Sequence, residues 1–96
     1  MPRVYMDEDN GRHVSQRIRE HFPDAADQKI MVDMVKKLLT LQAPPEALGQ
    51  YQWHVNIGEV GRIVMRGHSV RTVYPYSYNF PGGIEYKVAD GRLVRA

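Results

Sequence analysis

The chain contains no cysteine, and this absence excludes both a disulfide framework and a thiolate metal site. Long apolar runs are missing too. The most apolar stretch, residues 30–41, is interrupted by Asp33, Lys36 and Lys37, whereas a membrane-spanning helix needs about 20 mostly apolar residues. The N-terminus also lacks the basic-then-apolar layout of a signal peptide. We therefore expect no membrane partner and take the cytoplasm as the default location.

Signatures of cofactors and metal ions are missing as well. No Gly-rich loop of the phosphate-binding kind precedes a predicted helix, and no group of His, Asp and Glu has metal-ligand spacing. We predict no cofactor and no metal. The net charge of +2 and a pI of about 9.0 permit a phosphate-rich partner without requiring one.

What is present is the composition of one globular domain. Of its 96 residues, 43% are hydrophobic and 25% charged. A chain of this length is too short for two domains. We expect a polar lead-in over residues 1–11, a helical half over residues 12–49 and an antiparallel sheet half over residues 50–96. Within the lead-in, Asp9 or Asn10 offers a helix cap, and residues 4–6 could form an edge strand.

A first helix is predicted over residues 12–22. Val14, Ile18 and Phe22 recur every four positions and would form one apolar stripe. Pro23 disfavours helical geometry in the residue before it and ends the helix. A second stripe, beside the apolar one, consists of His13, Arg17 and His21.

A second helix is predicted over residues 25–41, with Asp24 as its cap. Its apolar residues fall at steps of three and four, and they include Leu38. Pro44 and Pro45 stop this helix. Residues 45–49 allow one more helical turn, with Pro45 at its first position and Gly49 just past its end.

Residues 51–57 alternate as a half-buried strand does. Further strands are predicted over residues 61–66, 69–74 and 84–88, with hairpin turns at Gly58, Gly61 and Gly67. Leu93 and Val94 could pair at the sheet edge. On the first strand, one side holds Tyr51, Trp53, Val55 and Ile57, and the other holds Gln52, His54 and Asn56.

These elements predict an α+β domain with two N-terminal helices packed on one face of a three- to four-stranded antiparallel sheet. Trp53 should then be buried against the second helix, and His54 should point to the open face. Whether Arg71 or Thr72 points outward stays open. An aromatic loop follows, containing Tyr74, Tyr76, Tyr78 and Phe80.

Histidine near arginine and hydroxyl groups suits metal-free RNA cleavage. That reaction needs a base, an acid and a cation that stabilises the pentavalent phosphate. Imidazole, with an ordinary pKa near 6.5, performs either proton transfer at neutral pH. The non-catalytic alternative is that His13 is a solvated surface residue and that His54 makes a structural hydrogen bond to a neighbouring strand or loop.

Two segments, GRHVSQRIREHFP and VRTVYP, resemble parts of the barnase, EndoU, colicin and RelE (BECR) superfamily of small RNases. The similarity in architecture spans roughly residues 11–78. Those domains place helices on one side of a four-stranded antiparallel sheet and use its exposed face. The resemblance implies functional roles for His13, Arg17 and Thr72, the last at the place of a strand hydroxyl.

Two classes of function follow. The first is a small RNase or RNase-like toxin with His54 and His13 as proton-transfer candidates and Thr72 as an orienting group. The second is a non-catalytic, phage- or operon-encoded inhibitor, immunity protein or antitoxin that holds a protein partner. A concavity with convergent His and Arg would favour the enzyme, and an apolar patch would favour the binder. The phosphate-binding candidates are Arg17, Arg62, Arg66 and Arg71, and the candidates for base stacking or partner contact are Tyr74, Tyr76 and Tyr78.

Overall fold

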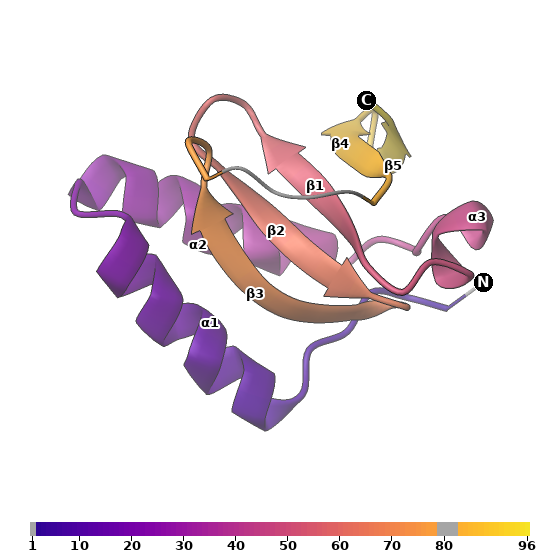
Figure 1. The fold of residues 1–96 in the computed structure, drawn as a ribbon, viewed down its shortest axis with the longest axis horizontal. Coiled ribbons are helices and arrows are strands. Elements are labelled where there is room, and N and C mark those ends of the chain that lie inside the picture. The colour runs from indigo at the N-terminus through magenta and orange to yellow at the C-terminus, as the bar shows by residue number, and fades with distance from the viewer. Residues whose placement is uncertain (1, 79–82) are drawn as a thin grey trace.

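Two long helices precede a sheet in the computed structural model, which describes residues 2–78 and 83–96 (Figure 1). The α+β class is therefore confirmed. Phe80 of the predicted aromatic loop and Met1 of the lead-in lie outside the described residues. The helices are α1 (Glu8–His21), α2 (Ala25–Leu38) and α3 (Pro45–Leu48). The strands are β1 (Trp53–Ile57), β2 (Gly61–Arg66), β3 (Ser69–Pro75), β4 (Glu85–Ala89) and β5 (Arg92–Arg95).

The sheet is mixed and has five strands in the order β3-β2-β1-β4-β5 within the described part of the chain. The prediction of a three- to four-stranded, purely antiparallel sheet was wrong. Strand β4 runs parallel to β1, because the chain crosses from β3 at one edge to the far side of β1. Alternation of side chains is the same in parallel and antiparallel strands, so it could not reveal this crossover.

Helix α1 begins at Glu8, four residues before the predicted start. Its cap is Asp7, neither Asp9 nor Asn10, and the Asp7 side chain accepts a hydrogen bond of 2.7 Å from the backbone N–H of Asn10. Glu8 and Asp9 lie in the first turn, where negative charge suits the helix dipole. The acidic cluster that we assigned to the lead-in is thus the start of the helix.

The lead-in itself pairs with two parts of the fold. Val4 is buried, and its backbone N–H donates to the carbonyl of Leu41 over 2.8 Å. The backbone N–H of Tyr5 donates to the carbonyl of His68, and the carbonyl of Tyr5 accepts from Val70. Single bridges at Arg3 and Tyr5 replace the expected edge strand.

Helix α2 lies behind the sheet in Figure 1 and covers its core face. Its Leu38 is fully buried, and so is Trp53 of β1, as predicted. The Trp53 indole N–H donates to the Gly67 carbonyl over 2.8 Å. Gly67 has a φ of 57° in the turn between β2 and β3, a conformation that favours glycine. No helix of the described residues is long and apolar enough to cross a membrane.

Helix α1 runs along the edge strand β3 (Figure 1). Its apolar stripe, with Val14 and Ile18, is buried in the same core that α2 covers. The neighbouring stripe reaches the opposite face of the sheet, where His13 meets Thr72. The two helices therefore do not both lie on one face of the sheet alone. Helix α1 also borders the open face, along the edge strand β3.

Candidate functional site

A β-bulge in β3 shapes the site. Met65 of β2 is paired with Val70, and the next residue, Val64, is paired with Thr72. Arg71 is the extra residue between these two pairs. A bulge re-aims the side chains beside it, and here Arg71 and Thr72 both line one cavity. The question of which of the two points outward is answered: both do.

A row of paired residues crosses the open face of the sheet. Thr72 is paired with Val64, Val64 with His54, and His54 with Glu85, on four neighbouring strands. Directly paired residues share a face. At one end of the row, His13 Nε2 of α1 lies 3.1 Å from Thr72 Oγ1, a hydrogen bond between residues 59 positions apart.

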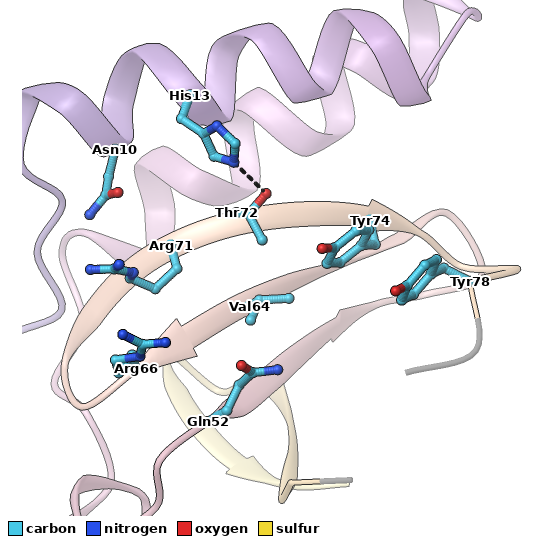
Figure 2. Close-up of a pocket in the computed structure, with 9 residues that line it drawn as sticks. All are labelled: Asn10, His13, Gln52, Val64, Arg66, Arg71, Thr72, Tyr74 and Tyr78. Atoms are coloured by element: carbon cyan, nitrogen blue, oxygen red, sulfur yellow. Dashed lines mark hydrogen bonds between the residues drawn. The ribbon is translucent and has the colours of Figure 1, made fainter. Parts of the chain in front are cut away.

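The cavity next to this hydrogen bond measures about 570 Å³, within the usual range of ligand sites. In Figure 2, the guanidinium groups of Arg66 and Arg71 lie toward one end and the rings of Tyr74 and Tyr78 toward the other. The His13 and Thr72 pair lies between them. The lining residues are Asn10, His13, Gln52, Val64, Arg66, Arg71, Thr72, Tyr74 and Tyr78.

Arg66 is held at the rim of the cavity by Tyr51. Its guanidinium carbon lies 4.4 Å from the centroid of the Tyr51 ring, and Arg66 Nη2 donates to the Tyr51 hydroxyl over 2.7 Å. We had placed Tyr51 on the core side of the first strand. It is 74% exposed instead, because β1 begins only at Trp53. Its ring restrains a cation that faces the cavity.

Two of the four predicted phosphate-binding arginines do not line the cavity. Arg17 forms an ion pair of 3.1 Å with Glu20 on the surface of α1. Arg62 donates from Nε to Asn56 Oδ1 over 3.2 Å and from Nη1 to the Tyr78 carbonyl over 2.7 Å. Both side chains therefore interact with neighbouring protein groups. Phosphate binding by either arginine stays a prediction.

The three predicted stacking tyrosines are divided in the same way. Tyr74 and Tyr78 line the cavity, and their rings are stacked with centroids 4.2 Å apart. Tyr76 is exposed and is not one of the lining residues. The guanidinium carbon of Arg62 lies 5.3 Å from the centroid of the Tyr76 ring.

His54 lies on the open face, in the same cross-strand row as Thr72. Its side chain is buried, however, with 4% of the residue's surface exposed. Its Nε2 lies 3.0 Å from Glu85 Oε1. This hydrogen bond, followed by one from Asn56, lowers the pKa of Glu85, and the charge of Arg62 adds a smaller effect in the same direction. Glu85 on the parallel strand β4 thus contacts His54 at the end of the row opposite His13.

Sequence reasoning gave Asn10 and Tyr51 no role in a site. Asn10 lies one turn before His13, and positions three apart share a helix face. The signal was Asp7, whose cap shows that the helix already includes Asn10. Gln52 was assigned to the polar side of the first strand and does line the cavity. Among the described residues, no group of three or more His, Asp and Glu is arranged to hold a metal ion.

We compared the chain with models of protein families, with curated proteins and with solved structures, and none of the three comparisons gave a match.

Proposed function

We propose that this protein cleaves RNA by metal-independent transesterification in the cavity between α1 and the open face of the sheet. The observation that carries this proposal is a His13 and Thr72 hydrogen bond of 3.1 Å on the wall of a cavity that Arg66 and Arg71 also line. A proton-transfer group, a hydroxyl and two cations, one of them held by Tyr51, converge there. That combination favours an enzyme over a protein-binding patch.

The reaction would begin with attack of a ribose 2′-oxygen on the adjacent phosphorus. His13 accepts the 2′-hydroxyl proton, the bond from phosphorus to the 5′-oxygen breaks, and a proton from the imidazolium or water reaches that oxygen. The products are a 2′,3′-cyclic phosphate and a 5′-hydroxyl. Thr72 orients the His13 ring before the substrate binds.

Arg66 and Arg71 have the task of stabilising negative charge on the phosphate. Charge grows on the non-bridging oxygens as the fifth bond to phosphorus forms, and a guanidinium group can donate two parallel hydrogen bonds to them. Tyr51 holds Arg66 over its ring, and the bulge directs Arg71 to the same cavity. A cation held in place before binding, as Arg66 is, needs little reorganisation during the reaction.

His54 has a different task in this proposal. It is buried against Glu85 and does not line the cavity, so we assign it to holding β4 beside β1. The resemblance to the BECR superfamily is part of the proposal through His13 and Thr72, the two carried-over residues that meet in space.

The test is incubation of the purified protein with single-stranded RNA of mixed sequence in the presence of EDTA. We expect cleavage that leaves 2′,3′-cyclic phosphate and 5′-hydroxyl ends. His13→Ala should lower the rate by about 100- to 10,000-fold, the usual contribution of a positioned acid or base. His68→Ala is the matched control, since His68 contacts Tyr5 and the Arg3 carbonyl outside the cavity, and it should retain full activity.

Absence of cleavage by the wild-type protein on single-stranded, duplex and structured RNA would refute the proposal and favour the non-catalytic, partner-binding alternative. Equal rates for wild type and His13→Ala would remove His13 from the mechanism. Ends other than cyclic phosphate and 5′-hydroxyl would exclude attack by the 2′-oxygen.

A further inference from the structure

The stacked rings of Tyr74 and Tyr78 form one end of the proposed catalytic cavity (Figure 2). Their centroids are 4.2 Å apart and their planes differ by 10°. Tyr74 belongs to β3, two residues after Thr72, on the same face of the sheet. The pair is therefore attached to the strand that carries Thr72, the residue hydrogen-bonded to His13.

The pair is held in place by several contacts. The backbone N–H of Tyr78 donates to the Pro75 carbonyl over 3.0 Å, and the Tyr78 carbonyl accepts from Arg62 over 2.7 Å. The ring of His21 lies 5.9 Å from that of Tyr74, centroid to centroid. Rings fixed before binding lose little conformational entropy when a ligand stacks on them.

Tyr78 nevertheless keeps 44% of its surface exposed. Single-stranded nucleic acids are bound by proteins that combine an exposed aromatic ring with arginine side chains in one groove: bases stack on the ring while arginine binds the backbone. This cavity holds both groups, the tyrosines at one end and the arginines at the other. Every nucleobase has a π-face, so such a platform tolerates different bases.

We infer that Tyr74 and Tyr78 form a stacking platform for one unpaired nucleobase next to the scissile phosphate, and that the substrate is single-stranded RNA. This inference rests on the proposed function. A base in an A-form duplex is stacked and paired within the helix and is not free to reach a protein ring. With a base on Tyr78 and a phosphate at Arg71, the intervening ribose lies near His13 and Thr72.

Tyr76 supplies a matched control from the same loop. It is 43% exposed, nearly the same as Tyr78, but it does not line the cavity. Loss of the Tyr76 ring removes the same number of aromatic atoms without removing the platform.

The experiment uses an RNA oligonucleotide whose cleavage site has been mapped. Two further substrates carry an abasic ribose on one side or the other of the scissile phosphate, which keeps the 2′-hydroxyl and the charge but removes the base. A third is the same oligonucleotide annealed to its complement. For the wild type, we expect one abasic substrate to be cleaved about 5- to 100-fold more slowly, the range for stacking of a single base. The duplex should be cleaved still less.

Tyr78→Ala should lower kcat/KM on the intact oligonucleotide by a similar factor and should no longer distinguish intact from abasic RNA. Tyr78→Trp should retain the discrimination, and Tyr76→Ala should behave as wild type. A merely structural role of Tyr78 would slow cleavage of all substrates equally, so the loss of discrimination is the decisive readout.

Two outcomes overturn the inference while leaving the proposed function intact. In the first, the wild type cleaves both abasic substrates as fast as the intact oligonucleotide. In the second, Tyr78→Ala still cleaves the intact oligonucleotide faster than the abasic one, by the same factor as the wild type. Rapid cleavage of the duplex would refute the single-stranded substrate class. If the wild type cleaves no RNA at all, the proposed function has failed, and the inference fails with it.

Discussion

The open face of the sheet holds two polar pairs that look alike in sequence and differ in setting. His13 and Thr72 meet at the edge of an accessible cavity, whereas His54 and Glu85 meet across the parallel strands β1 and β4 with the imidazole buried. Val64, which is 3% exposed, separates them in the same row. A polar histidine on a strand face therefore does not by itself mark a ligand site, because a strand from elsewhere in the chain can cover it.

The largest effect expected is a crossed result for the two histidines. His13→Ala should lower the RNA cleavage rate by about 100- to 10,000-fold and leave the melting temperature nearly unchanged. His54→Ala should instead destabilise the fold by about 1 to 3 kcal/mol, since it removes a buried hydrogen-bonding group. Its rate per folded molecule should stay within a few-fold of wild type.

Urea unfolding and initial cleavage rates, measured on both variants, check this result. If His54→Ala keeps wild-type stability but loses activity, the original assignment of His54 to proton transfer is correct, and our distinction between the two pairs is wrong.

The second effect concerns arginine. Arg71→Ala should lower kcat/KM by about 10- to 150-fold, because a hydrogen bond to a charged group contributes about 1.5 to 3 kcal/mol. Arg19→Ala removes the same charge from the exposed surface of α1 and should change kcat/KM only slightly. Equal losses would show that net charge, and not the position of Arg71 on the bulge, supports the reaction. Kinetics at two salt concentrations separate these cases.

Most of the fold could be predicted from local patterns. The helix starting after Asp24, the turn at residues 45–48 and the first four strands follow from spacing, caps and breakers that act over a few residues. The catalytic and phosphate-binding candidates included four that line the cavity: His13, Thr72, Arg66 and Arg71.

What could not be predicted depends on distant pairing. Glu85 covers His54 from 31 residues away, through a parallel strand that alternation does not distinguish from an antiparallel one. The bulge at Arg71 is a property of two paired strands and has no marker within β3 alone. Asn10 was missed for a local reason, namely the misplaced cap of α1.

A third change tests the core side of the same sheet. A Cβ on Gly61 would lie 2.7 Å from Phe22 Cζ and 2.9 Å from the Tyr74 carbonyl oxygen. Gly61→Ala should therefore lower the free energy of unfolding by about 1 to 3 kcal/mol, as overpacking usually does. In Gly49→Ala the new Cβ meets no atom within 4 Å, so little change is expected. Equal stabilities in urea would mean that Phe22 and β3 can move apart at no cost.

The smallest effect expected is the pH dependence contributed by Glu85. Its pKa is lowered in the folded protein, first by the hydrogen bond from His54. In acid, the unfolded chain therefore binds a proton at Glu85 more readily than the folded chain does, and stability rises with pH in that range. The contribution is fully present above the ordinary pKa of 4.5 and is lost as the pH falls through the lowered value. Removing the Glu85 carboxylate should therefore make the free energy of unfolding depend less on pH in acid.

Unfolding free energies of wild type and Glu85→Gln, measured between pH 3 and 6, therefore should converge as the pH falls. Glu59→Gln in the exposed turn between β1 and β2 is the control and should run parallel to wild type. His54→Gln should also flatten the curve, because it removes the largest cause of the lowered Glu85 pKa. If Glu85→Gln instead runs parallel to wild type throughout, the His54 and Glu85 pair does not stabilise the fold through its charge. The contrast with the His13 and Thr72 pair would then rest on burial alone.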